Sequence, residues 1–171
     1  PYPVDREYVA KQLGFSRIST NSMDAVSDRD FLLDLHGASA ICMIHLSRLA
    51  EELVLWSSEE FGFIEMIGDF TTGSSLMPQK RNPDFAELVR GRSGKIFGNL
   101  VGLLTTLKGL PLTYNRELQE DKEGIFETID TLLPCLEVSS GMVETMTLKS
   151  NRMRRAAQES YVLATDIADY L

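Results

Sequence analysis

The chain has 171 residues, of which 43% are hydrophobic and 25% charged, which suits one globular domain with a buried core and excludes a disordered or collagen-like chain. Seventeen Lys and Arg stand against 25 Asp and Glu, giving a net charge of −8. Because phosphates need a cationic surface, this balance argues against binding of nucleic acid or of an anionic membrane. No apolar stretch approaches the ~18 residues of a membrane span, so we expect no membrane partner.

The cysteines and the chain ends indicate the setting of the protein. Cys42 and Cys135 both lie in apolar, helix-like runs, which predicts reduced thiols and a cytoplasmic location. The chain begins at Pro1 without an initiator Met and stops at Leu171 inside a helix-like run. We therefore expect a piece of a longer protein.

Helical periodicity dominates the first sixty residues. A short helix is expected over residues 5–13, ending at Gly14, and a long helix over residues 28–58, opening at Ser27. Apolar residues cover more than half the circumference of the long helix. This distribution is typical of a helix covered on several sides, in a bundle centre or a subunit interface.

Residues 61–82 are rich in Gly, Ser and Thr and form a connection of unusual length, which indicates a functional segment. Asn82 and Pro83 then predict a helix start, as N-cap and first helical residue, with the helix running to Lys108. Glycines at positions 94, 98 and 102 give this helix a smooth stripe that allows another helix to approach closely.

A third helical run is expected over residues 115–148, with Pro134 as a kink or break, and Ser150 is expected to cap a last short element. The sequence therefore predicts an all-α chain with at least three long helices. Helices of this length in a chain this short leave apolar surface exposed, so we expect an oligomeric helical bundle.

A local excess of positive charge marks residues 80–95, where five basic residues face two acidic ones, a net charge of +3. Its leading edge is a helix N-terminus, which attracts anions, and Ser74 lies in the small-residue loop before it. One interpretation is a site for a small polyanion such as a dicarboxylate; the other is a solvated loop ahead of a well-capped helix. A Walker loop is excluded because position 89 is Val.

Other chemical interpretations are weaker. His36 and His45, the only histidines, lie on the long apolar helix without a cluster at metal-ligand spacing, and we expect them to be packed or surface residues. Tyr114, Gln119 and Lys122 either converge on a ligand carboxylate or belong to a solvated helix face.

Residues 73–83 match every fixed position of the pattern Gly-Ser-Ser-x-Met-Pro-x-Lys-x-Asn-Pro and so resemble the signature loop of the fumarase/aspartase superfamily. Within it, Gln79, residues 21–31 and residues 109–123 resemble the argininosuccinate lyase and delta-crystallin family. The resemblance covers essentially the whole chain. It implies a homotetramer whose core is a bundle of long helices, with residues 1–149 in the central bundle domain and residues 150–171 opening a C-terminal helical domain.

The resemblance also implies the chemistry and the residues that perform it. The reaction is elimination of argininosuccinate to arginine and fumarate, without metal or organic cofactor, in sites that draw loops from three subunits. A histidine supplied by another subunit is absent from this chain. The implied catalytic residues are Ser74 as the base, Lys80 as the group that stabilises the carbanion, and Glu87 as the partner of that histidine; the implied substrate contacts are Arg29, Asn82, Tyr114, Gln119 and Lys122.

Two alternatives of other classes remain. One is a structural, delta-crystallin-like protein without turnover, although the loop keeps Ser74, Lys80 and Asn82. The other is a sister lyase acting on adenylosuccinate, aspartate or malate, against which Gln79 and residues 114–122 argue.

Overall fold

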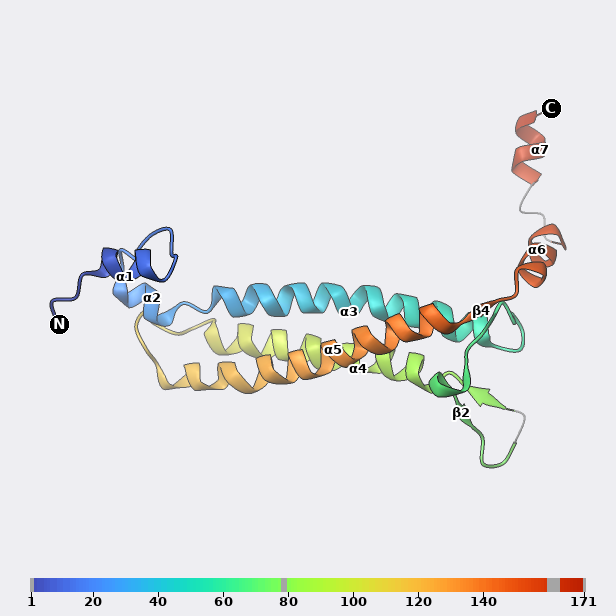
Figure 1. The fold of residues 1–171 in the computed structure, drawn as a ribbon, viewed down its shortest axis with the longest axis horizontal. Coiled ribbons are helices and arrows are strands. Elements are labelled where there is room, and N and C mark those ends of the chain that lie inside the picture. Colours follow the sequence, from blue (N-terminus) through green and yellow to red (C-terminus); the bar gives the residue numbers. More distant parts are fainter. Residues whose placement is uncertain (1, 78–79, 160–163, 171) are drawn as a thin grey trace.

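The computed structural model describes residues 2–77, 80–159 and 164–170, which form an elongated bundle of three long helices (Figure 1). These helices are α3 (Asp30–Ser57), α4 (Asp84–Leu107) and α5 (Asp121–Thr145). Helix α4 packs against both α3 and α5, and α3 also packs against α5. The all-α, long-helix fold predicted from the periodicity is confirmed.

Short elements occupy the two ends of this bundle. The helices α1 and α2 lie at one end, and the strands with α6 and α7 lie at the other (Figure 1). In the described ranges, two small antiparallel sheets form, one from β1 and β4 and one from β2 and β3. The bounds of these elements are α1 Arg6–Gln12, α2 Ser22–Ser27, β1 Ile64–Glu65, η1 Gly68–Phe70, β2 Thr72–Gly73, β3 Arg81–Asn82, η2 Arg116–Glu120, β4 Thr147–Leu148, α6 Ser150–Glu159 and α7 Ala164–Tyr170.

The core runs along the seam between the three long helices. Met43 and Leu53 on α3, Ile96 on α4 and Met142 on α5 are fully buried there. Cys135 on α5 is buried in the same cluster, and both cysteine thiols are free, as predicted. Burial of these side chains provides the main stabilisation of the bundle.

Two predicted helix starts are wrong by one or two residues. Ser27 does not open the long helix; it ends α2, where its hydroxyl donates to the carbonyls of Met23 and Asp24. The Asp28 carboxylate instead accepts from the backbone N–H of Asp30, the first residue of α3. Helix α4 likewise begins at Asp84, because Asn82 pairs in β3 rather than acting as the N-cap.

The helical run predicted for residues 115–148 is interrupted near its first residues and not at Pro134. A 3₁₀ turn, η2, precedes α5, and α5 continues through Pro134 without a break. Proline removes one backbone donor from a helix, and Pro134 is exposed, while Thr131 and Cys135 on either side of it are buried in the bundle. The last residues of the predicted run form β4, which pairs with β1.

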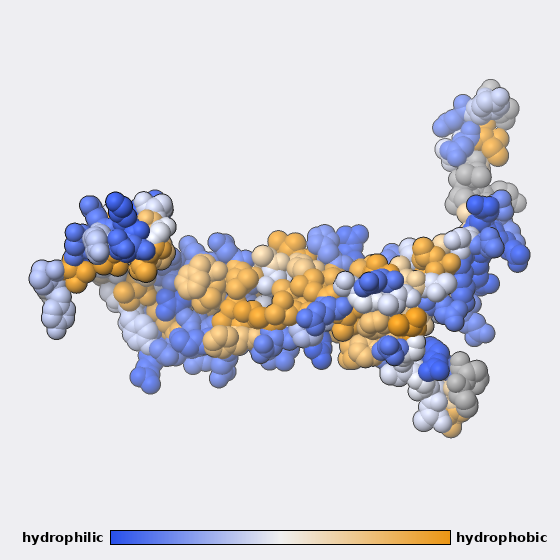
Figure 2. Space-filling model, viewed as in Figure 1, coloured by the Kyte–Doolittle hydropathy of each residue, from blue (hydrophilic) through white to orange (hydrophobic). Residues whose placement is uncertain are grey.

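Apolar side chains remain exposed along the bundle, as Figure 2 shows for one face. Phe31 and Ile41 on α3, Val101 on α4, and Phe126 and Leu133 on α5 are among the exposed large hydrophobic residues. Large exposed apolar surfaces are typical of places where a protein contacts another molecule. In the described part of the chain, no helix is long and apolar enough to cross a membrane.

Gly141 on α5 allows the segment before the β2–β3 hairpin to pack against the bundle. A Cβ added at Gly141 would lie 2.6 Å from Cζ of Phe70, whose ring packs edge-to-face on Phe85. We expect Gly141→Ala to displace Phe70 and lower the free energy of unfolding by about 1–3 kcal/mol, the usual cost of overpacking. Urea unfolding of the chain measures this change.

Gly124 on the same helix is the matched control, because a Cβ there would make only ordinary contacts of 3.7 Å or more. Gly124→Ala is expected to raise the free energy of unfolding by about 0.5–1 kcal/mol through helix propensity. Equal shifts of the urea midpoint for the two variants would contradict the packing role of Gly141.

Candidate active site

The β2–β3 hairpin presents the loop with the recognised pattern at one end of the bundle. Thr72 pairs with Asn82 and Gly73 with Arg81, so the loop leaves and returns at adjacent points. The Thr72 hydroxyl donates a hydrogen bond to the Asp84 carboxylate in the first turn of α4. This contact fixes the hairpin against the start of a long, rigid helix.

Ser74 is held in a tight turn immediately after β2. Its Oγ accepts hydrogen bonds from the backbone N–H groups of Leu76, at 3.2 Å, and Met77, at 3.1 Å. Its own N–H donates to the carbonyl of Lys80 across the loop, at 3.2 Å. Two N–H donors aimed at one hydroxyl oxygen stabilise negative charge that develops on that oxygen.

The other residues predicted for this end lie around the hairpin. The Lys80 side chain is exposed, Asn82 is half-buried, and Glu87 is exposed in the first turn of α4. Gln79, on which part of the family resemblance depends, lies outside the described residues. This end therefore brings together Ser74, Lys80, Asn82 and Glu87 within the hairpin and the helix start that follows it.

Not all the positive charge of residues 80–95 serves the loop. Arg90 forms an ion pair with Glu51 on α3, and Lys95 pairs with Glu127 on α5 at 2.6 Å. These two cations join neighbouring helices, so the polyanion interpretation is left to the basic side chains nearer the hairpin. Within the described residues, Lys80 and Arg81 are the basic side chains on the hairpin itself.

At the opposite end of the bundle, Arg29 and Lys122 meet at one carboxylate. Arg29 precedes α3, and its Nε donates to Oδ2 of Asp121 at 2.5 Å; Lys122 Nζ donates to Oδ1 of the same side chain at 3.0 Å. Asp121 is only 6% exposed. Burial alone would raise the pKa of Asp121, but the hydrogen bonds from Arg29 and Lys122 outweigh it and hold that pKa below its ordinary value.

Tyr114 and Gln119 lie close together in the connection between α4 and α5. The Gln119 amide donates to the Tyr114 hydroxyl, and buried Leu118 anchors η2 between them. Thr113, just before Tyr114, has a positive φ of 76° and donates its N–H to the carbonyl of Met23 at 3.1 Å. A β-branched residue in this conformation is strained, and such strain is typical of functional sites.

The predicted site residues thus form two groups at opposite ends of one chain (Figure 1). Helix α4 separates them, because the hairpin precedes it and the Tyr114 connection follows it. With 24 residues, α4 extends for about 36 Å. A substrate of ordinary metabolite size cannot touch both groups of a single chain.

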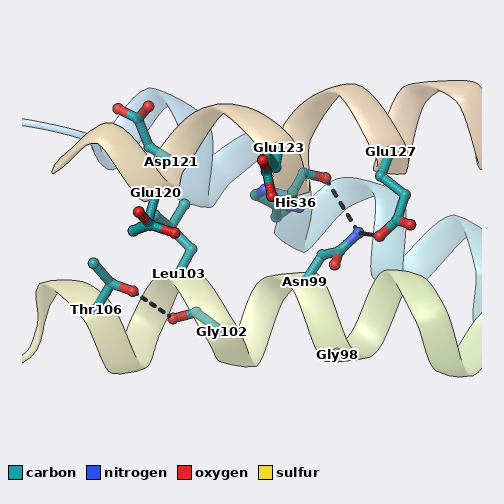
Figure 3. A pocket seen from close by; sticks show the side chains of 11 residues that line it. His36, Gly98, Asn99, Gly102, Leu103, Thr106, Glu120, Asp121, Glu123 and Glu127 are labelled. Atoms are coloured by element: carbon teal, nitrogen blue, oxygen red, sulfur yellow. Dashed lines mark hydrogen bonds between the residues drawn. The ribbon is translucent and has the colours of Figure 1, made fainter. Parts of the chain in front are cut away.

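A cavity of about 370 Å³ lies between the three long helices, beside the second group (Figure 3). His36, 1% exposed, lines it and its Nδ1 lies 3.2 Å from the Thr128 hydroxyl; burial lowers the pKa of His36. The Asn99 amide donates to Glu127 and to Thr128. The prediction of packed or surface histidines is confirmed, since His45 is exposed. Among the described residues, no cluster of His, Cys, Asp or Glu is arranged to hold a metal ion.

Sequence reasoning missed Asp121, which lies between Gln119 and Lys122 in a segment for which a solvated helix face was one of two interpretations. A signal for its burial exists in the helical spacing. Asp121 lies three residues after buried Leu118 and four before buried Ile125, so it falls on the inward-facing stripe of α5. The spacing does not reveal its partner Arg29, which lies 92 residues earlier.

Curated relatives match the chain along its whole length. A protein of Dehalococcoides mccartyi named argininosuccinate lyase is 61% identical over 171 residues, and one of Bacillus cereus with the same name is 58% identical over 170 residues. The chain spans 37% of the length of these relatives.

Solved structures give a consistent picture. A variant of EDDS lyase with bound fumarate superposes with a TM-score of 0.86 at 31% identity, covering 98% of this chain and 33% of that one. EDDS lyase in complex with formate superposes with a TM-score of 0.87 at 32% identity, over the same shares of the two chains. The family model described as Lyase matches residues 1–98, more than half of the sequence. The chain therefore belongs to the lyase family.

Proposed function

We propose that the protein containing this chain is an argininosuccinate lyase, which eliminates arginine from argininosuccinate and releases fumarate. The single observation that carries the chemical step is the turn at Ser74, whose Oγ receives two backbone N–H donors. The substrate is proposed from the names of relatives 58–61% identical over the chain. On the same basis we propose a role in arginine biosynthesis in the cytoplasm.

In this mechanism Ser74 acts as the base. Its alkoxide takes a proton from the substrate carbon that lies beside a carboxylate, and the electron pair left on that carbon spreads onto the carboxylate. The Lys80 ammonium stabilises this growing negative charge, and Asn82 holds the substrate in position. The electron pair then forms the double bond of fumarate as the carbon–nitrogen bond breaks and the nitrogen leaves with arginine.

The leaving nitrogen needs a proton, and we propose that it comes from a histidine of another subunit that is paired with Glu87. At the other end of the substrate, Arg29, Tyr114, Gln119 and Lys122 contribute binding contacts. The positive charges of Arg29 and Lys122 suit a carboxylate, while Tyr114 and Gln119 offer neutral hydrogen-bonding groups. No step requires a metal or an organic cofactor.

We also propose that each active site forms between chains of a homotetramer. The two groups of site residues lie at opposite ends of α4, so the hairpin of one chain must meet the Arg29 and Lys122 end of another. The exposed apolar residues of α3 and α5 and the open stripe of glycines on α4 provide surface for such packing. The division after residue 149, with α6 opening a further helical domain, is part of the same proposal.

The function is tested by turnover. The whole protein carrying this region is expected to convert argininosuccinate to equal amounts of arginine and fumarate, with fumarate followed by its absorbance and arginine by amino-acid analysis. Adenylosuccinate and aspartate serve as the comparison substrates. Turnover of either of these without turnover of argininosuccinate would show a sister lyase, and a folded protein that turns over none of them would show a structural protein.

Assembly gives an independent prediction. A Cβ at Gly94 would meet no atom within 4 Å in the single chain, so Gly94→Ala is expected to stabilise an isolated chain by up to about 1 kcal/mol. If another helix packs on this stripe, the same methyl group keeps the helices apart and weakens association. We expect sedimentation at micromolar concentration to show an oligomer for the parent chain and a lower association constant for Gly94→Ala. A stable, folded monomer of the parent chain would contradict the proposed bundle.

A further inference from the structure

Asp121 is a buried carboxylate that joins two cations from distant segments. It is the first residue of α5, where the helix N-terminus favours negative charge, and it is only 6% exposed. One oxygen accepts from Arg29 Nε at 2.5 Å, and the other accepts from Lys122 Nζ at 3.0 Å. A buried charge is stable only when it is paired in this way. Both oxygens are therefore committed to cations of the proposed substrate-binding group.

The guanidinium of Arg29 is almost fully constrained by these contacts. Its Nη1 donates to the carbonyls of Val26, at 3.2 Å, and Asp28, at 2.7 Å, while its Nε is held by Asp121. A guanidinium is planar with donors in fixed directions, so fixing Nε and Nη1 also fixes Nη2. Among the described residues Nη2 has no hydrogen-bond acceptor, which leaves its two donors for another molecule.

Lys122 differs from Arg29 because its side chain is long, flexible and 53% exposed. Such a side chain samples many rotamers, and ordering it costs conformational entropy when a ligand binds. The contact with Asp121 limits that sampling in advance and leaves two of the three ammonium donors unused by this bond. Asp121 also reduces the repulsion between the two neighbouring positive charges.

We propose that Asp121 is a positioning residue of the active site: it aligns Arg29 and Lys122 so that both receive the same anionic substrate. This inference rests on the proposed function, in which Arg29 and Lys122 bind argininosuccinate. In this role Asp121 acts through the two cations, because each of its oxygens accepts a hydrogen bond from one of them. Its effect therefore falls on substrate affinity rather than on the proton transfer at Ser74.

The test uses the whole oligomeric protein carrying Ser74→Ala, which suppresses turnover, and titrates it with argininosuccinate in a calorimeter. Asp121→Asn keeps the size of the side chain and removes its charge. We expect it to raise Kd about 10- to 100-fold, the range seen when supporting partners of metal-binding side chains are removed. Asp130→Asn is the matched control, since Asp130 is an exposed carboxylate on the same helix with no ion pair to the described residues. It is expected to leave Kd unchanged.

A purely structural role for Asp121 predicts a different result. Partial unfolding would lower the measured number of binding sites and the melting temperature while the remaining sites keep the parent Kd. A second variant sharpens the distinction: if Asp121 acts through Lys122, adding Asp121→Asn to Lys122→Met costs less affinity than the two separate changes multiplied together. An unchanged Kd for Asp121→Asn, or full multiplication of the two effects, would overturn the inference.

Measuring turnover with Ser74 intact distinguishes failure of the proposed function from failure of the positioning role. If the protein binds argininosuccinate more weakly after Asp121→Asn and yet releases no fumarate, the positioning role is supported and the lyase activity is contradicted. If the protein cleaves argininosuccinate and Asp121→Asn leaves Kd unchanged, the lyase activity is supported and the positioning role is contradicted. A parent that does not bind argininosuccinate contradicts both.

Discussion

Ser74→Ala in the whole protein is expected to lower kcat for argininosuccinate by about two to four orders of magnitude, the contribution of a general base. The hydroxyl is needed only as the proton leaves carbon, so substrate affinity should change little. Loss of rate without loss of affinity is the signature of an interaction made in the transition state. Steady-state kinetics of fumarate release give kcat, and calorimetric titration of the variant gives Kd.

Ser75→Ala is the matched control for this result. Ser75 has the same chemistry one residue later, but its side chain is exposed and makes no hydrogen bond with the described residues, whereas Ser74 Oγ receives two backbone donors. We therefore expect Ser75→Ala to retain most of the activity. Equal, mild losses for the two variants would show that the base lies elsewhere.

The long helices could be predicted because their apolar spacing dictates them, but their first residues could not. Ser27 and Asn82 are both good N-cap residues by type. In the structure Ser27 bonds backward into α2, and Asn82 is taken up by its pairing with Thr72. Each of these residues can either cap the helix that follows it or bond to another nearby segment. Contacts made elsewhere in the fold decide between the two.

The candidate site residues could be identified from the recognised pattern. Which of them lie close together in one chain could be decided only once the helix between them was known. Forty-two positions separate Lys80 from Lys122 in sequence, which by itself allows contact. Once residues 84–107 are one rigid helix, the two ends lie about 36 Å apart and contact is excluded. Asp121 could not be assigned a role for the opposite reason: its partner Arg29 comes from far away in sequence and meets it only in the fold.

The second large expected effect is that activity returns when two different variants assemble into one oligomer. The effect is large because each variant alone is nearly inactive. Ser74→Ala removes the base at the hairpin end, and Lys122→Met removes a substrate contact at the other end. If each active site combines the hairpin of one chain with the Lys122 end of another, a hybrid contains some sites in which both groups are native. With equal amounts and random assembly, about a quarter of all sites are restored.

This co-expression experiment tests most directly the central claim that the active site is shared between chains. The two variants carry different affinity tags, hybrids are purified on both tags in turn, and the rate of fumarate release from argininosuccinate is measured. The doubly changed protein, Ser74→Ala with Lys122→Met in one chain, is co-expressed with itself as the control. Because purification on both tags removes the two homotetramers, the account predicts that the hybrids recover up to about 30% of the parent rate while the control stays inactive. Hybrids no more active than either variant alone would contradict it.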